Sequence, residues 1–202
     1  FALAATAMWS FSLEPRLVAV LALVFTTVLN IGYLPVFWRD IDLRRLAPFA
    51  LGGLCGVPLG AYALATLPAS AVRLWVGSLL LTYGSYRLLR HRAIALQMSP
   101  SVARTGDLVV GFIGGVFGGL GGLSGFLPVL WCGLRDWDKR SQRALIQSYI
   151  LFANFLSMAW IGRLVGVDAA ARGNILLGLP FVILGGWLGL RLFARFDTPT
   201  FN

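Results

Sequence analysis

A few polar side chains capable of holding a ligand stand within long apolar stretches of this 202-residue chain. Gln147 and Asn154 are seven residues apart, so on a helix they occupy nearly the same angular position. Thr27 and Asn30 form a similar polar pair in an earlier apolar stretch. Hydrogen bonding between helices is the simpler interpretation, with each bond worth about 0.6–2 kcal/mol. Because polar groups are costly inside apolar segments, we expect instead that these side chains line a substrate path, where neutral donors hold an oxyanion.

A glycine-rich, charge-free segment, Leu108–Leu134, carries the densest motif in the chain. Small-xxx-small spacing within it favours close helix packing. Glycine and proline weaken helices, so the segment also predicts a helix that is interrupted at its proline. The helix that begins there would expose backbone N–H groups at its N-terminus, and these groups attract an anion. Nucleotide binding is disfavoured, because no Lys-Ser/Thr pair follows and no strand precedes it. The candidate ligand-binding positions here are Gly121, Gly122, Ser124, Gly125 and Pro128.

One enzymatic alternative concerns the same motif. The sequence at Gly122–Gly125 resembles the Gly-x-Ser-Gly motif of rhomboid intramembrane proteases, whose chemistry needs a histidine base beside Ser124. The only histidine, His91, lies between two arginines in an expected loop, so we expect no catalytic residue and no enzyme. A single histidine makes no metal centre. Cys55 and Cys132 stand in apolar stretches without paired spacing, which predicts buried structural thiols and neither metal nor cofactor.

The composition indicates what kind of protein must position these residues. Hydrophobic residues make up 58% of the chain, the mean hydropathy is +0.80, and only 12% of the residues are charged. A soluble domain carries about a quarter charged residues, so the composition predicts an all-α integral membrane protein in a lipid bilayer. The net charge is +9, and 16 of the 17 basic residues are arginines. These arginines border apolar stretches instead of forming a basic stripe, which argues against nucleic acid as a partner.

Charge-free stretches predict where the chain crosses the bilayer. The five expected spans, of which the third is short and extended by flanking arginines, are Leu17–Trp38, Leu46–Val72, Leu74–Tyr86, Ala144–Gly162 and Gly173–Leu190. If Leu108–Leu134 crosses once, the basic residues divide nine to eight between the two sides; if it dips in and returns, they divide thirteen to four. The positive-inside rule prefers the second arrangement, a re-entrant hairpin opening on the cytoplasmic side. Asp107 and Arg163, at span borders, are expected to be solvated boundary charges, with a gating pair as the alternative.

The chain also contains an internal repeat. Phe25–Asn30 resembles Phe152–Ser157 at an offset of 127 residues, and a Gly-x-x-Leu-Gly pattern beginning at Gly56 recurs from Gly185 at an offset of 129. The similar offsets and conserved order make the weak matches credible. With the topology above, the corresponding helices cross in opposite directions, as in the inverted repeats of secondary transporters.

This repeat predicts the domain organisation. We expect a single transmembrane domain over residues 1–202, with the first repeat in 1–98 and the second in 99–202. The first-half counterpart of the hairpin would lie upstream of Phe1, and the last helix of the second repeat would lie beyond Asn202. We therefore expect that one or both of these elements are missing from the sequence.

A family resemblance follows from these motifs. Gly118–Pro128 resembles the glycine-rich, proline-ended motif of the sulfite exporter TauE/SafE family, and Gln147–Asn154 and Leu51–Gly60 are similar to its later segments. The resemblance covers essentially the whole chain. It implies a multi-pass transporter of the bacterial inner membrane that moves small sulfur-containing anions (sulfite, sulfoacetate or related organosulfonates), driven by an ion gradient. A transporter or channel for another small solute is the alternative within transport, and a homo-oligomer stays open.

Overall fold

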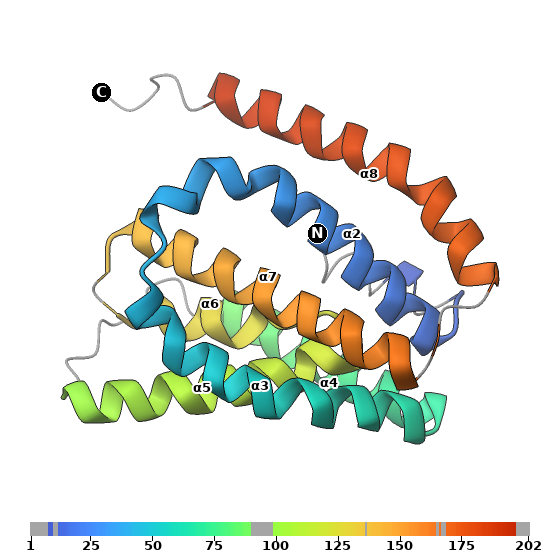
Figure 1. Cartoon of the computed structure of the whole chain (residues 1–202), viewed down its shortest axis with the longest axis horizontal. Coiled ribbons are helices and arrows are strands. Elements are labelled where there is room, and N and C mark those ends of the chain that lie inside the picture. The colour runs from blue at the N-terminus through green and yellow to red at the C-terminus, as the bar shows by residue number, and fades with distance from the viewer. Residues whose placement is uncertain are drawn as a thin grey trace.

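A computed structural model of the protein describes residues 8–9, 12–89, 99–135, 137–164, 166 and 169–196, and the regular elements in these residues are all helices (Figure 1). In chain order they are α2 (Pro15–Phe37), the 3₁₀ helix η1 (Trp38–Asp40), α3 (Leu43–Thr66), α4 (Ala69–Leu89), α5 (Pro100–Gly121), α6 (Phe126–Cys132), α7 (Lys139–Leu164) and α8 (Ala169–Phe196). The expected all-α fold is confirmed.

Four segments within the described residues are long and apolar enough to cross a bilayer. They are Pro15–Asp40, Leu43–Thr66, Lys139–Leu164 and Ala171–Gly189. These correspond to four of the five expected spans, and the expected short span Leu74–Tyr86 lies within α4, which is not among the four. The chain is therefore a helical membrane protein by length and composition of its helices.

The predicted span Leu46–Val72 is wrong at its C-terminal end. α3 ends at Thr66 and α4 begins at Ala69, so Val72 lies in the next helix. The residue before a proline is disfavoured in the helical conformation, and Leu67, which precedes Pro68, has an extended backbone with ψ of 146°. An uncharged stretch can therefore contain a turn.

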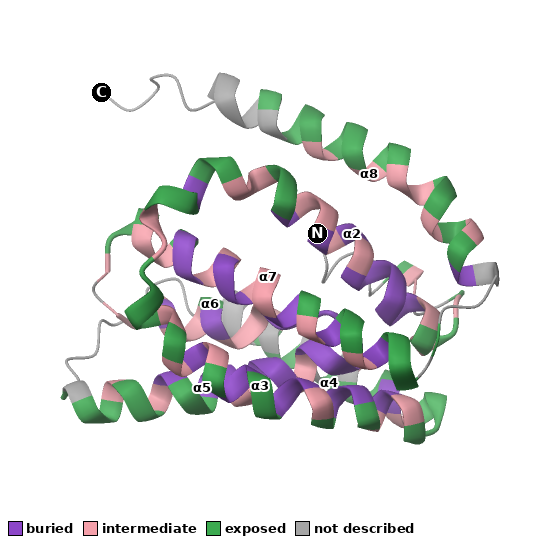
Figure 2. Ribbon diagram, in the orientation of Figure 1, coloured by how far each residue is buried: buried purple, intermediate pink, exposed green. Residues whose placement is uncertain are grey.

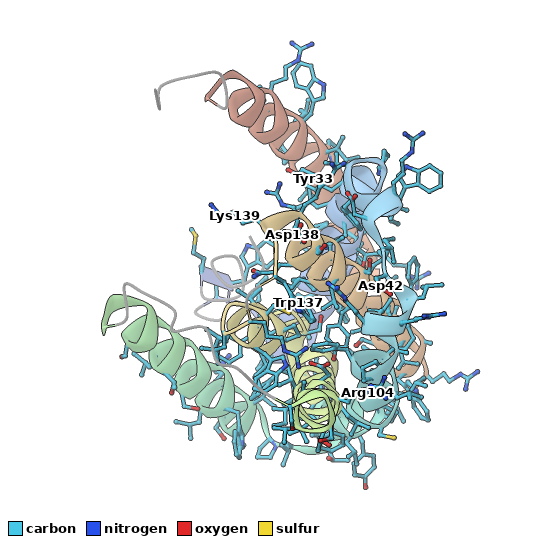
Figure 3. The ribbon with its side chains drawn as sticks, turned by 90° about the vertical axis from the view of Figure 1, so that its left-hand side faces the viewer. Tyr33, Asp42, Arg104, Trp137, Asp138 and Lys139 are labelled. Carbon is cyan, nitrogen blue, oxygen red and sulfur yellow. The ribbon has the colours of Figure 1, made fainter. Side chains whose placement is uncertain are left out.

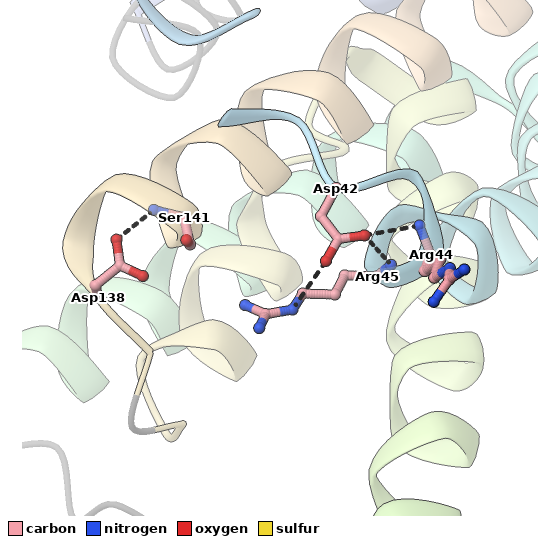
Figure 4. Close-up of polar contacts among 5 residues, drawn as sticks. All are labelled: Asp42, Arg44, Arg45, Asp138 and Ser141. Carbon is pink, nitrogen blue, oxygen red and sulfur yellow. Dashed lines mark hydrogen bonds and ion pairs between the residues drawn. The ribbon is translucent and has the colours of Figure 1, made fainter. Parts of the chain in front are cut away.

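Two aspartates fix helix starts (Figure 4). At the start of α3, Asp42 Oδ1 accepts the backbone N–H of Arg44 at 2.9 Å and that of Arg45 at 3.4 Å. At the start of α7, Asp138 Oδ2 accepts the backbone N–H of Ser141 at 2.9 Å. Both carboxylates satisfy N–H groups that have no partner within their own helix. Hydrogen bonds from the hydroxyl and N–H of Ser141 favour the charged carboxylate and lower the pKa of Asp138.

Helices α3 and α5 run parallel and meet backbone to backbone through rows of glycine. The rows, spaced by four residues, are Gly52, Gly56 and Gly60 on α3, and Gly111, Gly115 and Gly119 on α5. A Cβ atom on Gly115 would lie 3.0 Å from the Cα atom of Gly53, and one on Gly56 would overlap the carbonyl oxygen of Phe112. Close helix packing by the glycine-rich segment is confirmed, but the row against α3 is not the one expected, since that expectation was based on the spacings of Gly114, Gly118 and Gly122 and of Gly121 and Gly125. The glycines of α5 do not interrupt the helix, however, because α5 is continuous up to Gly121.

Beyond α5 the chain reverses, and α6 packs antiparallel against it. A Cβ atom on Gly114, in the second half of α5, would lie 3.4 Å from Pro128 Cδ. Further on, the Arg135 guanidinium donates to the carbonyl of Ala103, in the first turn of α5, at 2.8 Å. The chain has thus returned to the level at which α5 began. We call the segment from Pro100 to Arg135 the hairpin, with a tip between α5 and α6 and an open end at Arg135.

Different helix termini lie at the two ends of the bundle. Figure 3 looks onto the end at which the hairpin opens, where Arg104 of α5 lies with Asp138 and Lys139 at the start of α7. At the opposite end, the start of α2 contacts the end of α3. The guanidinium of Arg16, at the start of α2, donates a hydrogen bond of 2.7 Å to the carbonyl of Ala65 in the last turn of α3. Arg104 and Lys139, on either side of the glycine-rich segment, therefore lie at one end.

Two clusters of buried apolar side chains stabilise the bundle. One cluster contains Phe49, Val57, Val110, Cys132, Leu145, Tyr149 and Ala153, and the other contains Ala19, Val20, Leu23, Ala61, Leu64, Val72, Leu120, Leu123 and Ile161. Along α7 the first cluster ends at Ala153 and the second begins at Ile161, so polar residues between them lie near the middle of that helix. α8 lies at the edge beside α2, and most of its large apolar side chains are exposed (Figure 2).

Candidate functional site

The tip of the hairpin is the turn Gly122–Gly125. Gly122 has a φ of 70°, in the left-handed region that glycine adopts without steric cost. Its N–H donates to the carbonyl of Gly118 at 2.8 Å, which satisfies a carbonyl at the end of α5. The turn holds Ser124 between α5 and α7.

Three polar side chains meet beside the tip: Ser124, Asn154 and Ser157, each of them 0% exposed. Ser124 Oγ lies 3.5 Å from Asn154 Oδ1, and Ser157 follows about one turn after Asn154 on α7. In the part of the chain that the structure describes, Asn154 Nδ2 and Ser157 Oγ have no hydrogen-bond partner. A buried donor without a partner costs about 1–3 kcal/mol, so these groups are available to a ligand that enters the site.

Glycines on α5 leave room for this cluster. A Cβ atom on Gly118 would lie 3.0 Å from Ser124 Cβ and 3.7 Å from Ser157 Oγ. One on Gly114 would lie 3.0 Å from the carbonyl oxygen of Ser124 and 3.2 Å from the hydroxyl of Tyr149. These two glycines form a second row on α5, distinct from the row that packs against α3. Any side chain on this row would displace the tip or α7.

α2 approaches the tip from another side. A Cβ atom on Gly122 would lie 3.3 Å from the backbone nitrogen of Leu23. Thr27 Oγ1 donates to the carbonyl of Leu23 at 2.7 Å and lies 3.9 Å from Met158 Sδ, about one turn beyond Asn154 on α7. Thr27 is therefore at the border of the polar cluster.

The structure brings together only part of the predicted set. Asn30 donates from Nδ2 to the carbonyl of Thr26, in its own helix, at 2.8 Å. Gln147 is half-buried on α7, about 10 Å along the helix axis from Asn154. Gly121 is buried, yet a Cβ atom there would meet no atom within 4 Å, so space is left beside it.

The predicted interruption at Pro128 is wrong in position. The break lies earlier, at Gly122–Gly125, and Pro128 is the third residue of α6, in a first turn where a missing N–H removes no intrahelical bond. Pro128 is buried, and Gly125 packs against the side chain of Ile150. Because α6 has only seven residues, its N-terminus is a poor anion site. The side-chain donors of the cluster are the groups that can bind an anion here.

A buried ion pair at the open end of the hairpin corrects a second prediction. Asp107 is 5% exposed, and its Oδ1 lies 2.6 Å from a terminal nitrogen of Arg135 and accepts Trp131 Nε1–H at 2.7 Å. Asp107 is not a solvated boundary charge, because α5 begins at Pro100 and α6 covers this face of it. The Ser-Pro pair that starts α5 is the sequence signal from which this helix start could have been placed. Arg163 is exposed, as expected.

The two cysteines differ. Cys132 is buried, as predicted, whereas Cys55 is exposed, so the prediction is wrong for Cys55. His91, the base that a protease would need, lies outside the described residues. The described neighbour of the Ser124 hydroxyl is the Asn154 carboxamide, which is not a base.

Long apolar helices around a buried polar cluster define a multi-pass helical membrane protein. A sequence model of the family described as sulfite exporter TauE/SafE matches residues 1–202, the whole chain. The chain therefore belongs to the sulfite exporter TauE/SafE family, whose members are membrane transporters, and the expected resemblance is confirmed. No curated protein and no solved structure matches the chain.

Proposed function

We propose that this protein is a secondary transporter that moves small sulfur-containing anions, such as sulfite, sulfoacetate or related organosulfonates, across the bacterial inner membrane. The observation that carries the proposal is the buried cluster of Ser124, Asn154 and Ser157, with the Asn154 amide and the Ser157 hydroxyl unpartnered in the described chain. Oxyanions accept hydrogen bonds from such donors. Neutral donors suit a transporter, because a buried cation would be costly whenever the site is empty.

The position of the cluster supports a transport site. Asn154 lies near the middle of Lys139–Leu164, which is long and apolar enough to span a bilayer. Secondary transporters bind substrate near the bilayer midplane, where irregular backbone lines the site. The tip of the hairpin supplies such irregular backbone beside Ser124.

The proposed membrane arrangement is a re-entrant hairpin that opens to the cytoplasm. It is supported by the thirteen-to-four division of basic residues and by the return of Arg135 to the level of Ala103. We also propose that residues 1–98 and 99–202 are inverted repeats. In this arrangement α2 and α7, which carry the matching polar positions, run in opposite directions (Figure 1).

Anion flux into proteoliposomes tests the function. Sulfite and sulfoacetate uptake are measured for the wild type, Asn154→Ala, Ser157→Ala and the control Ser78→Ala, whose exposed hydroxyl bonds only to the carbonyl of Trp75 in the contacts of the described chain. A hydrogen bond to a charged group is worth about 1.5–3 kcal/mol, so each site variant should lose about tenfold to a hundredfold in kcat/KM. The control should keep wild-type uptake.

Each result decides one part of the proposal. Unchanged uptake in both Asn154→Ala and Ser157→Ala would remove the cluster from the transport site. No flux of any sulfur anion by the wild type would overturn the substrate class and leave a carrier or channel for another solute. Covalent labelling by a fluorophosphonate that is lost in Ser124→Ala would replace transport by the protease alternative.

A further inference from the structure

The open end of the hairpin holds a buried ion pair that the proposed binding cluster does not use. A terminal nitrogen of Arg135 lies 2.6 Å from Asp107 Oδ1, and the two side chains are 10% and 7% exposed. The indole N–H of Trp131 donates to the same oxygen at 2.7 Å, and Arg135 also donates to the carbonyl of Ala103 at 2.8 Å. These bonds join α6 and the chain that follows it to the first turns of α5, and they hold the hairpin closed.

The pairing leaves Arg135 incompletely satisfied. A guanidinium carries five N–H donors in a planar fork, and a well-placed carboxylate engages two of them at once. Asp107 instead shares one oxygen between Arg135 and Trp131. The Nε atom of Arg135 is buried and has no hydrogen-bond partner in the described part of the chain. A sulfite or sulfonate group, with three oxygens, can engage Nε and a terminal nitrogen together.

Arginine and tryptophan side chains connect this pair to the exposed surface. The side chain of Arg45 is 45% exposed, is paired with Asp42, and has its guanidinium carbon 4.9 Å from the ring centroid of Trp137. Arg135 lies 4.8 Å from the same ring and 5.2 Å from that of Trp131. Trp137 belongs to the bundle end shown in Figure 3. Stacking on the rings compensates Arg135 for lost hydration without neutralising its charge, so it still attracts anions.

We propose that the Asp107–Arg135 pair is a substrate-displaced gate: a sulfur oxyanion takes the place of the Asp107 carboxylate on Arg135 and thereby releases α6 from α5. This inference rests on the proposed function. Breaking a buried ion pair without a replacement leaves an uncompensated charge, which keeps the gate closed when no anion is present. An anion on Arg135 removes that penalty for the arginine, and release of α6 lets water hydrate the displaced Asp107 carboxylate, so opening is coupled to substrate.

A matched pair of salt bridges makes the gate testable. The Arg140–Asp40 pair has nearly the same separation, 2.7 Å, at the same end of the bundle, but its arginine side chain is 75% exposed. Sulfite binding to purified protein is followed by tryptophan fluorescence, since Trp131 and Trp137 lie against Arg135. Sulfite uptake into proteoliposomes is measured in parallel.

The expected results separate the two pairs. Asp107→Asn removes the competing charge and keeps an acceptor for Trp131, so the sulfite Kd and the KM for uptake should both fall by tenfold or more. Arg135→Gln should raise both by tenfold or more. Asp40→Asn and Arg140→Gln should stay within twofold of the wild type. Changes in the Asp107 and Arg135 variants no larger than in these controls would overturn the gate.

Folding failure and failure of the proposed function are both distinguishable from failure of the gate. If Arg135→Gln does not fold, the double variant Asp107→Asn/Arg135→Gln replaces it, because this variant buries no unpaired charge. The double variant must fold and bind sulfite at least tenfold more weakly than the wild type. Binding as tight as that of the wild type would overturn the gate. If the wild type moves no sulfur anion but its sulfite binding still depends on Arg135, the substrate class falls and the anion site at Arg135 stands. If it moves sulfite with no dependence on either residue, the gate falls and the function stands.

Discussion

The contact between α3 and α5 gives the sharpest prediction from this structure. Substitution of Gly56 by Ala would place a Cβ atom onto the carbonyl oxygen of Phe112, with the carbonyl carbon of Phe112 at 2.9 Å and the backbone nitrogen of Val116 at 3.0 Å. All three atoms belong to the backbone of α5. No side chain can rotate to relieve the overlap, so the two helices must separate.

The magnitude follows from a comparison with Gly32, a glycine of α2 at which a Cβ atom would meet nothing within 4 Å. Alanine is favoured over glycine in a helix by about 1 kcal/mol at both positions, so this gain cancels between Gly56→Ala and Gly32→Ala. The difference between the two variants is therefore the overpacking cost, about 1–3 kcal/mol. At about 2–4 °C per kcal/mol for a chain of this size, Gly56→Ala should unfold about 2–12 °C below Gly32→Ala.

Thermal unfolding of the two purified variants in the same detergent, followed by circular dichroism, measures this difference. The wild type provides the reference for the gain expected in Gly32→Ala. If Gly56→Ala unfolds at the same temperature as Gly32→Ala or above it, then α3 and α5 do not meet through their backbones, and the reasoning from the glycine rows is refuted.

Two further predictions concern the membrane arrangement and pH. Single cysteines at Arg104 and Lys139, in an otherwise cysteine-free chain, should react with an impermeant maleimide from the same side of the membrane; labelling from opposite sides would restore a single crossing of the glycine-rich segment. For Asp138, whose pKa is lowered by the hydrogen bonds from Ser141, the folded state binds its proton less tightly than the unfolded state. The stability advantage of the wild type over Asp138→Asn should therefore be constant above the ordinary aspartate pKa of about 3.9 and be lost as the pH falls through the lowered pKa of Asp138. Unfolding measured at several pH values tests this expectation. A difference in stability that does not depend on pH would contradict the role of Asp138 as a helix cap.

Most of the helices could be predicted from the sequence, because charges at the borders of apolar stretches mark where spans end. The boundaries that failed are those set by backbone chemistry. Pro68 ends α3 inside an uncharged stretch, and Pro100 starts α5 well before the charge-free stretch begins at Leu108. Asp107 consequently lies within a helix instead of at its border, and this one boundary explains why its burial was not foreseen.

Several residues of the candidate site could be predicted from the sequence, but the arrangement of these residues in space could not. Polar residues in apolar stretches indicate Ser124 and Asn154, which the fold brings together from positions 30 residues apart. Which glycines face which neighbour was not predictable, because rows offset by three residues along α5 have the same composition. Only the structure assigns the row of Gly111 to α3 and the row of Gly114 to the hairpin tip. Ser157 shares the polar face of Asn154 in the sequence but is not among the predicted site residues, and the structure buries it one turn from Asn154.

The glycine rows also have a mechanical consequence. Two helices whose backbones touch interlock, since each row of one helix rests against the carbonyl groups of the other, and close-packed surfaces of this kind do not slide continuously. α3 and α5 must then move as one rigid body in any conformational cycle. We expect peripheral helices to move relative to this pair. One such helix is α8, which contacts the bundle through few buried side chains. We therefore expect the glycine-joined pair to be the stationary frame of the molecule, against which α6 and α8 can move.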